Sequence, residues 1–424
     1  MNTFPDLLLS PVLQNNLARN GFVQPTPVQA MAIPKQLAGH DLVITAQTGT
    51  GKTLAFLLPL LEKLAQPGNP PGVSALILSP TRELAIQISQ AFVQLAAGTG
   101  FRAAVVVGGL NEQTQLNAIR RGAQVLIATP GRLSDFLERK LVNLGSAHTL
   151  ILDEADRMLD MGFLPTIKRI LSVLPVARQN IFCSATIESS VAPLINAHLK
   201  NPVRIAIGST TKPAAEIDLH VYEVEQDCKL GLLEKMLQEE RGSFLVFART
   251  KHGADRLAKK LARSGSKAAA IHGDRTQSQR NLALRGFQEG SYRVLVATDV
   301  AARGVHVEGI AHVVNYDLPQ VPEDFIHRVG RTGRAGLRGT ASTFSTRSER
   351  GEIRKIEQLL QLQLTRRPVP SGLEQEARGP QGAAVRFGKR ESRVHAGHAV
   401  GHAVGHKAVR SFAPRPKFSR RKRG

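Results

Sequence analysis

Residues 149–156 read Thr-Leu-Ile-Leu-Asp-Glu-Ala-Asp, a short apolar run that ends abruptly in a pair of carboxylates. A buried parallel strand has this pattern where its C-terminal end opens into a binding site. The simpler interpretation is a core strand followed by an Asp that caps the next helix, at 155–159. The choice depends on two further features, a phosphate-binding loop upstream and a source of positive charge downstream.

Residues 46–53 read Ala-Gln-Thr-Gly-Thr-Gly-Lys-Thr and supply the upstream feature. A short strand-like run precedes them and an apolar helical run follows, which is the context that a phosphate-binding loop requires. A chance Gly-Lys-Thr turn is the weaker alternative. Gly49 and Gly51 would let backbone N–H groups surround the β-phosphate. Lys52 would reach the β- and γ-phosphates, and the Thr53 hydroxyl would hold Mg²⁺.

The segment 21–29, Gly-Phe-Val-Gln-Pro-Thr-Pro-Val-Gln, is stiffened by two prolines. A rigid segment of this kind could present Phe22 for stacking on a base and Gln29 for a bidentate pair of hydrogen bonds. A side-chain amide suits adenine, which offers one donor and one acceptor on the same edge. Taken alone, however, the segment is better explained as an ordinary loop before a helix.

The chain has 424 residues, enough for two domains and an appendage, and a formal net charge of +22. A soluble protein this basic usually binds a polyanion, most often nucleic acid. No apolar run approaches the roughly 18 residues of a membrane-spanning helix, and residues 1–9 lack the basic start of a signal peptide. Two cysteines provide no disulfide framework, and Cys183 is expected in the core. The composition therefore predicts a cytoplasmic, reduced protein with no membrane partner.

Strand-like runs alternate with helical runs through the first half of the chain, which predicts a mainly parallel sheet with helices on both faces. The strands are expected at 73–78, 103–107, 125–128, 150–152 and 181–183. Small polar clusters follow several of them, at 80–84, 108–109, 129–132 and 184–186, all on the C-terminal edge where ligands bind. Hydroxyls, glycine N–H groups and arginines make sugar–phosphate contacts without reading sequence. Each cluster alone is a turn or an N-cap, but together they predict a track for a nucleic acid strand.

A loose segment at 208–213 is typical of a linker, and the alternation then restarts at 244–247, 268–271, 294–296, 312–315 and 340–344. No Gly-Lys-Thr loop occurs in this half, so it is a partner domain and not a second ATPase. Arg331 and Arg334 are three residues apart and would share a face of a helical turn. Facing the phosphate loop of the first domain, they could act as arginine fingers on a γ-phosphate. A basic, solvated helix end is the alternative.

The composition changes near residue 366, where Pro, Gly, Arg and Lys take over. Residues 378–424 hold thirteen Lys or Arg and one acid, Glu391, so this segment carries +12 of the total charge and is too polar to fold. Its histidine repeat could bind metal, but low-complexity drift explains it better. The basic cluster at 419–423 suits RNA phosphates. The expected organisation is a first domain at 1–205, a linker at 206–217, a second domain at 218–365 and a disordered basic tail at 366–424.

Taken together, residues 4–365 resemble the DEAD-box ATP-dependent RNA helicases, a family named for the string at 153–156. The segment around Gln29, with Phe4 upstream, looks like the Q motif of the family. The other motifs, I, Ia, Ib, III, IV, V and VI, are similar to residues 46–53, 80–85, 129–132, 184–186, 246–250, 298–304 and 327–336. A full set in this order is highly specific. The compact core and the basic tail look most like the bacterial RhlE-type subgroup.

The resemblance implies two tandem RecA-like domains that close on ATP, Mg²⁺ and RNA. The catalytic residues would be Lys52, Asp153, Glu154, Arg331 and Arg334. Asp153 would hold Mg²⁺ with Thr53, and Glu154 would orient the attacking water. ATP would further contact Phe22, Gln29, Ala46, Gln47, Thr48, Gly49, Thr50, Gly51 and His306. RNA would run over Arg82, Gly109, Thr129, Arg132, Gly273, Arg280 and Thr298. Nucleotide state would be coupled to RNA by Asp156, Ser184 and Thr186.

The activity that the resemblance implies is that of an RNA-stimulated ATPase, which separates short RNA duplexes locally or remodels RNA–protein complexes. Binding would be largely independent of sequence, to single-stranded or short duplex RNA, and contacts to 2′-hydroxyls would favour RNA over DNA. Ribosome assembly or RNA decay would supply protein partners. A non-catalytic RNA clamp or annealing chaperone is the alternative, and a DNA helicase is a third.

Two positions depart from the family pattern. Most members have Asp two residues after the Arg303-Gly304 pair, as an acceptor for the ribose hydroxyls of ATP, and this chain has His306. A neutral imidazole accepts one hydrogen bond but lacks the charge and the second oxygen of a carboxylate, so weaker ATP binding with retained chemistry is expected. Phe325 replaces a common Tyr, which removes one hydroxyl.

Overall fold

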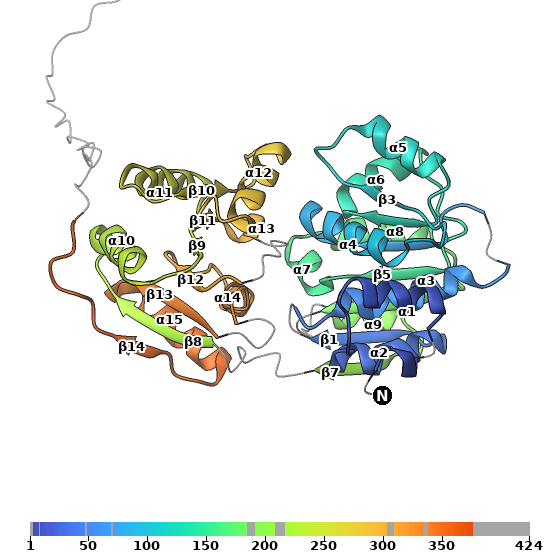
Figure 1. Ribbon diagram of the computed structural model, residues 1–424, viewed down its shortest axis with the longest axis horizontal. Helices are drawn as coiled ribbons and strands as arrows, with labels where there is room; N and C mark the ends of the chain where they lie inside the picture. The colour runs from blue at the N-terminus through green and yellow to red at the C-terminus, as the bar shows by residue number, and fades with distance from the viewer. Residues whose placement is uncertain are drawn as a thin grey trace, which may run out of the picture. The chain divides into compact units, whose positions relative to one another are not determined.

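The computed structural model describes residues 3–7, 9–46, 49–68, 71–184, 191–207, 217–302, 309–333 and 338–375. Within these ranges the chain forms two seven-stranded parallel sheets with helices on both faces (Figure 1). Among the described residues, no helix is long and apolar enough to cross a membrane. The expected α/β architecture of two tandem sheet domains is confirmed.

The first sheet has the strand order β3-β4-β2-β5-β6-β1-β7, and its neighbouring strands all run parallel. The strands are β1 (Leu42–Ala46), β2 (Ala75–Leu78), β3 (Ala103–Val106), β4 (Val125–Ala128), β5 (Thr149–Leu152), β6 (Gln179–Ser184) and β7 (Val203–Ile207). Because β6 lies between β1 and β5, the loop after β1 and the acidic stretch after β5 flank the same strand end. The sheet therefore brings together the two stretches from which the sequence argument began.

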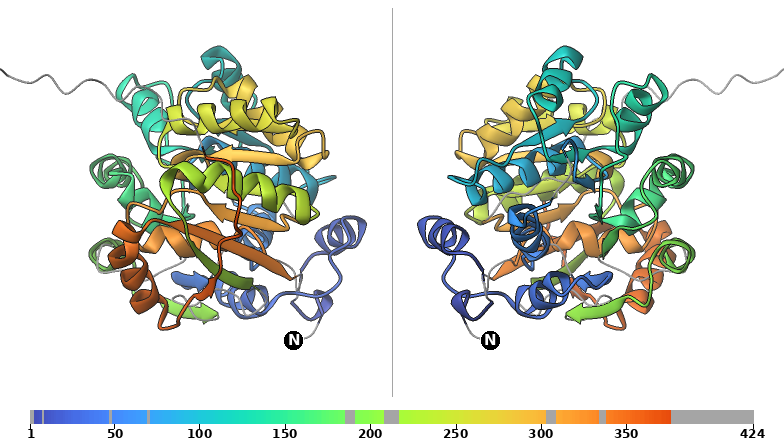
Figure 2. Two further views of the ribbon diagram at one scale, coloured as in Figure 1. Left: turned by 90° about the vertical axis from the view of Figure 1, so that its left-hand side faces the viewer. Right: turned by 90° about the vertical axis from the view of Figure 1, so that its right-hand side faces the viewer.

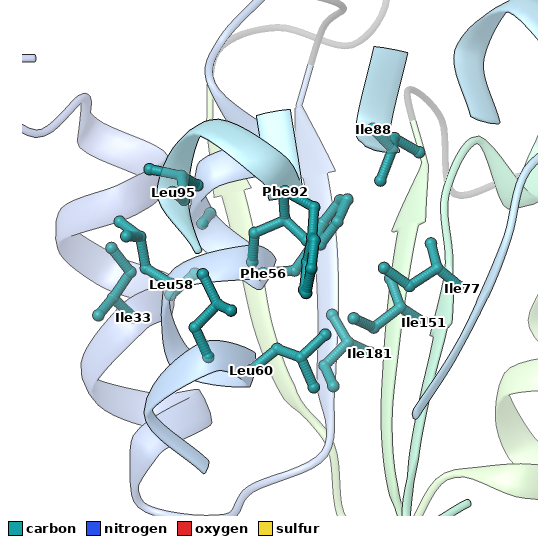
Figure 3. Close-up of a cluster of buried hydrophobic side chains, with 14 of the residues drawn as sticks. Ile33, Phe56, Leu58, Leu60, Ile77, Ile88, Phe92, Leu95, Ile151 and Ile181 are labelled. Carbon is teal, nitrogen blue, oxygen red and sulfur yellow. The ribbon is translucent and has the colours of Figure 1, made fainter. Parts of the chain in front are cut away.

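Helices cover both faces of this sheet (Figures 1 and 2). Along its central strands, residues alternate between two cores. The helices are α1 (Pro11–Arg19), α2 (Pro27–Leu37), α3 (Lys52–Ala65), α4 (Arg82–Leu95), α5 (Glu112–Arg120), α6 (Pro130–Glu138), α7 (Ala155–Asp160), α8 (Leu164–Ser172) and α9 (Ala192–His198). Leu42 and Ile44 face one core and Val43 faces the other, as the period of two in a strand requires. Figure 3 shows Phe56 and Phe92 packed beside Ile151 in the first of these cores. Cys183 lies in the same core, as expected.

The second sheet has the strand order β10-β11-β9-β12-β13-β8-β14, again with parallel neighbours. Its strands are β8 (Ile217–Glu223), β9 (Phe244–Phe247), β10 (Ala268–Ile271), β11 (Val294–Ala297), β12 (His312–Asn315), β13 (Gly339–Ser345) and β14 (Thr365–Arg367). Its helices are α10 (Lys229–Glu239), α11 (Lys251–Arg263), α12 (Gln277–Gln288), α13 (Asp299–Ala302), α14 (Glu323–Val329) and α15 (Arg350–Leu360). No glycine loop of the phosphate-binding kind precedes a helix in the described part of this sheet, in agreement with the sequence.

The domain boundaries differ from those expected by a few residues. The first sheet continues through β7 to Ile207, and the second begins with β8 at Ile217. The second domain also continues past residue 365, since β14 pairs with β8 and the side chains of Val369 and Leu373 pack on the core beside α10. The chain crosses α10 at Gly231, where an added Cβ would lie 2.7 Å from the carbonyl oxygen of Glu374 (Figure 2). The basic tail beyond residue 375 lies outside the described residues.

Candidate nucleotide and nucleic-acid sites

The loop after β1 has the backbone geometry of a phosphate-binding loop. Gly49 and Gly51 have φ values of 90° and 93°, which L side chains rarely adopt, and Gly51 caps the N-terminus of α3. Lys52 is the first residue of α3, and its ammonium donates a hydrogen bond to the carbonyl of Ala46. The first N–H groups of a helix of this length are directed at the loop and favour an anion. Gln47 and Thr48 lie outside the described residues.

The segment before α2 is joined to this loop through Gln29. Its Nε2 donates to the carbonyl oxygen of Gly51 at 3.1 Å, and its Oε1 accepts from the backbone N–H of Thr26 at 2.9 Å. Only 4% of the residue is exposed. A side-chain amide can make two further hydrogen bonds, so these contacts leave a donor and an acceptor for adenine. Phe22 is 37% exposed on the preceding loop, where stacking on a base remains an expectation.

Asp153 and Glu154 follow β5 directly and are both buried, at 4% and 9% exposure. Burial raises the pKa of Asp153 to about 7, with a further contribution from the negative charge of Glu154 and an opposing one from Lys52. The charge of Lys52 acts on Asp153 because the loop after β1 and the end of β5 meet at the same edge of the sheet. The backbone N–H of Glu154 donates to Asp153 Oδ1 at 3.1 Å.

Glu154 has an unusual backbone conformation for a residue with a side chain. Its φ and ψ are 51° and 54°, in the left-handed region, where it caps α7. Its Oε2 is buried without a hydrogen bond in the described part of the chain and lies 3.8 Å from Nη1 of Arg157. Strain and an unsatisfied buried oxygen at one residue are typical of functional sites.

The residues expected to couple nucleotide and RNA lie close to this edge. Asp156 is 2% exposed in α7, and its Oδ1 accepts from the backbone N–H of Arg157 at 2.9 Å. Ser184 is the last residue of β6, beside β1 and β5, and is 3% exposed. Thr186 lies outside the described residues.

On the first domain, the structure brings Arg82 and Gly109 together. Arg82 begins α4, whose N-cap Thr81 accepts from the N–H of Leu84 at 3.3 Å. A Cβ added to Gly109 would lie 2.2 Å from Nη1 of Arg82, so the guanidinium covers the bare backbone of this glycine. A larger residue at 109 would displace the arginine.

Thr129 and Arg132, the other two residues expected to contact RNA here, sit at the start of α6. Thr129 caps this helix and is 9% exposed. Arg132 pairs with Glu112 at 3.0 Å and with Asp135 at 2.9 Å, and its guanidinium lies 4.6 Å from the ring centre of Phe136. An RNA phosphate at Arg132 must therefore compete with two carboxylates.

On the second domain, Gly273 and Thr298 follow β10 and β11 on the C-terminal edge of the sheet, and Arg280 lies in the first turn of α12. Nη2 of Arg280 is 2.9 Å from Glu83 Oε2, and Nε2 of Gln277 donates to Glu83 Oε1 at 2.9 Å. Glu83 was not predicted from the sequence, because an acid in a helix that starts with Arg82 looks like an ordinary first-turn residue.

The buried ion pair of Arg328 was not predicted from the sequence either. Arg328 is 2% exposed and makes a bidentate ion pair with Asp299, at 2.6 and 2.7 Å. It also donates to the carbonyl of Asp317 at 2.7 Å. Arg331 is 3% exposed, and its Nε donates to the carbonyl of His327 at 3.2 Å. Arg334 and His306 lie outside the described residues.

Two family models match the chain, that of the DEAD/DEAH box helicases over residues 26–194 and that of the helicase conserved C-terminal domain over residues 228–336. The chain is 40% identical over 331 residues to the DEAD-box ATP-dependent RNA helicase CshA of Bacillus licheniformis, covering 77% of this chain and 67% of that one. It is 42% identical over 330 residues to the ATP-dependent RNA helicase vasa of Drosophila melanogaster, covering 76% of this chain and 50% of that one.

Solved structures of other proteins have the same fold as this chain. S. cerevisiae Dbp5 bound to RNA and ADP BeF3 matches with a TM-score of 0.78 at 29% identity, over 87% of this chain and 96% of that one. Mss116p bound to ssRNA and AMP-PNP matches with a TM-score of 0.80 at 27% identity, over 87% of this chain and 80% of that one. The two sheets are therefore tandem RecA-like domains, and the chain belongs to the DEAD-box family of ATP-dependent RNA helicases.

Proposed function

We propose that this protein is an RNA-stimulated ATPase that separates short RNA duplexes or remodels RNA–protein complexes. The observation that carries the proposal is the convergence of Lys52 and Asp153, two buried and oppositely charged side chains at one sheet edge. Hydrolysis of a nucleoside triphosphate needs a cation on the outer phosphates and a carboxylate for Mg²⁺ side by side. The relatives are named ATP-dependent RNA helicases, which supports the same activity here.

The side chains at this edge fit Mg²⁺. The carboxylate of Asp153 and the hydroxyl of Thr53 are oxygen ligands, which Mg²⁺ prefers, and nucleotide phosphates and water would complete its shell. Without an ion, the pKa of Asp153 is raised to about 7, so a divalent cation would stabilise the charged carboxylate. No cluster of three or more His, Cys, Asp or Glu in the described residues could hold a metal by itself. Bound Mg²⁺ would neutralise charge that develops on the phosphates.

The remaining residues have roles that follow from their chemistry. Lys52 would hold the β- and γ-phosphates, and the N–H groups around Gly51 would hold the β-phosphate. Glu154 would accept a hydrogen bond from the attacking water through its unsatisfied carboxylate oxygen. Arg331, together with Arg334, would stabilise charge on the γ-phosphate in the transition state.

RNA would contact the sugar–phosphate track of both domains. Arg82 would supply a charge beside the bare backbone of Gly109, and Thr129 and Thr298 would supply hydroxyls at strand ends. Gly273, Arg132 and Arg280 complete the track. Contacts of this kind read the backbone and its 2′-hydroxyls and not the base sequence.

Three finer assignments belong to the same proposal. The compact core followed by a basic tail supports the RhlE-type subgroup. A cytoplasmic location and partners in ribosome assembly or RNA decay follow from the family and the charge, and remain predictions. The RNA clamp and the DNA helicase are the alternatives that the experiment must separate.

The test is ATP hydrolysis measured without polymer, with single-stranded RNA and with DNA of the same length. We expect RNA, and not DNA, to stimulate hydrolysis. Glu154→Gln should abolish hydrolysis while ATP and RNA still bind. Hydrolysis that RNA does not stimulate would favour the clamp, and equal stimulation by DNA would favour the DNA helicase. A short RNA duplex that stays intact with ATP would refute strand separation.

A further inference from the structure

A buried histidine lies at the proposed RNA edge of the second domain without a role in the mechanism above. His272 directly follows β10, and its side chain is 4% exposed. Its Nε2 lies 3.0 Å from Oδ1 of Asp255 in α11 and 3.3 Å from Nε of Arg275. Asp255 also pairs with Nη2 of Arg275 at 2.5 Å. The three side chains form one cluster, which we call the His272 cluster.

The contacts of this cluster select one tautomer of the imidazole. Nε2 cannot donate to Asp255 and accept from Arg275 at the same time. The shorter contact is to the carboxylate, and Arg275 is already bound to that carboxylate through Nη2, so the proton lies on Nε2 and is donated to Asp255. Nδ1 is buried and has no hydrogen-bond partner among the described residues. A side chain present only for stability would avoid this cost, because an apolar residue of similar size would leave no polar atom unsatisfied.

The cluster fixes the turn that contains Gly273. The backbone N–H of Arg275 donates to the carbonyl of His272 at 3.1 Å and closes the turn. A second ion pair, between Lys251 and Asp274 at 2.6 Å, ties the same turn to the start of α11. The turn is thus held from both sides, by the first two turns of α11 and by its own backbone.

The same turn also sets the start of α12. Thr276 caps this helix, accepting from the N–H of Gln279 at 3.3 Å, one residue after Arg275. Arg280 lies one turn further on. A rotation of the turn would therefore move both Gly273 and Arg280, two of the residues proposed to contact RNA.

We propose that His272 and Asp255 are positioning residues for RNA: their hydrogen bond holds the Gly273 turn and the first turn of α12 in the arrangement that receives the RNA backbone. This inference rests on the proposed function, since it concerns the RNA track of the same helicase. Neither residue touches ATP or the reacting atoms in this scheme. The effect of removing the bond should therefore fall on RNA affinity and not on the chemical step.

A matched control exists in the same domain. His312 lies at the start of β12, where the strands begin, at the end of the sheet opposite to the proposed RNA edge. Its Nδ1 is 2.7 Å from Glu240. Its side chain is 13% exposed, and its ring stacks on Phe244 with centres 4.3 Å apart. Removing this imidazole breaks a second, partly buried histidine–carboxylate contact without touching the RNA edge.

The experiment measures ATPase rate against the concentration of a single-stranded RNA homopolymer, at saturating ATP, with the full chain. For His272→Leu we expect the RNA concentration at half-maximal stimulation to rise about tenfold, as for loss of one charge-assisted hydrogen bond, while the maximal rate and the KM for ATP stay within about twofold. His272→Gln keeps a donor near the position of Nε2 and should recover most of the RNA affinity. His312→Leu should lower the Tm and leave RNA affinity unchanged.

Asp255→Asn provides a second route if the leucine variant does not fold, because the Asp255 side chain is 29% exposed and the amide keeps its shape. It should weaken RNA binding in the same direction. Unchanged RNA affinity in a folded His272→Leu or Asp255→Asn variant would overturn this inference and leave the proposed function intact. An equal loss of affinity in His312→Leu would also overturn it, by showing a general effect of stability. A wild-type protein that RNA does not stimulate would overturn the proposed function, and this inference with it.

Discussion

The contact between Gln29 and Gly51 predicts that the segment before α2 controls ATP affinity through the phosphate loop. The informative change is Gln29→Glu, which keeps the oxygen that accepts from Thr26 and removes the Nε2 group, and with it both the hydrogen bond to Gly51 and the second N–H that is left for adenine. In its place a carboxylate oxygen faces the carbonyl of Gly51, and a negative charge is added beside the loop that would hold phosphates.

The magnitude follows from the partial burial of this contact. The carbonyl of Gly51 keeps the backbone N–H of Ala55 as a donor at 3.2 Å, so losing the hydrogen bond from Gln29 and gaining a charge beside it should cost about 2 kcal/mol, which corresponds to a factor of roughly 30 in an equilibrium constant. If the loop binds phosphates only with the Gly51 carbonyl in place, the cost lowers the fraction of binding-competent protein and raises the apparent Kd by the same factor. We expect Gln29→Glu to weaken ATP binding by about 10- to 30-fold.

The control is Gln36→Glu in the same helix. Gln36 is also 4% exposed, and its Nε2 donates to the carbonyl of Phe56 in α3 at 3.2 Å, one helical turn beyond the phosphate loop. In thermal unfolding, this variant should lose as much stability as Gln29→Glu. Its ATP affinity should stay within about twofold of wild type, since its contact lies away from the loop. Titration with a fluorescent ATP analogue measures the ATP affinity of both variants. Equal weakening of ATP binding in the two variants, or none in Gln29→Glu, would refute the reasoning.

Three further predictions follow. Lys229 is fully buried, donates to the carbonyl of Tyr316 at 3.1 Å and lies within 4.0 Å of two half-buried carboxylates. In a urea titration, Lys229→Met should therefore cost about 3 kcal/mol of unfolding free energy. Lys235→Met, which breaks the exposed pair with Glu239, is the control and should cost less than about 0.5 kcal/mol. His306→Asp, which restores the family residue, should tighten ATP binding, and an unchanged or weaker affinity would contradict the role given to this position. Deletion of residues 378–424 should weaken RNA binding and flatten its dependence on salt, whereas an unchanged slope would exclude the tail as an RNA anchor.

The central strands could be predicted from sequence to within about two residues, because a strand buried on both faces reads as a continuous apolar run. The strands β4, β9, β10 and β12 were predicted to the residue. The strands β7, β8 and β14 were not predicted, since most of their residues are partly or fully exposed and give no apolar run; β7 and β14 lie at sheet edges, and β8 lies between β13 and β14. Backbone pairing with a neighbouring strand holds them in the sheets, and this pairing has no local signature.

The phosphate loop and the acidic pair could be predicted because each lies in a short segment whose order and context are specific. The Asp299–Arg328 ion pair could not, because its partners are 29 residues apart and neither segment shows which arginine of residues 328–334 pairs with the aspartate. The same holds for Glu83, whose partners Gln277 and Arg280 are nearly 200 residues away. Long-range pairs of this kind require the fold before they can be recognised.

These ion pairs also change how the charge of the protein should act on RNA. Arg132, Arg275 and Arg280 already have carboxylate partners in Glu112, Asp255 and Glu83. A phosphate that binds such an arginine displaces a carboxylate of the protein, so it releases fewer salt ions than a phosphate that binds an unpaired arginine. The tail, in contrast, holds thirteen basic residues against one acid. Because the salt dependence of RNA binding counts released ions, it should arise mainly from the tail, while the paired arginines of the two domains contribute position and little salt sensitivity.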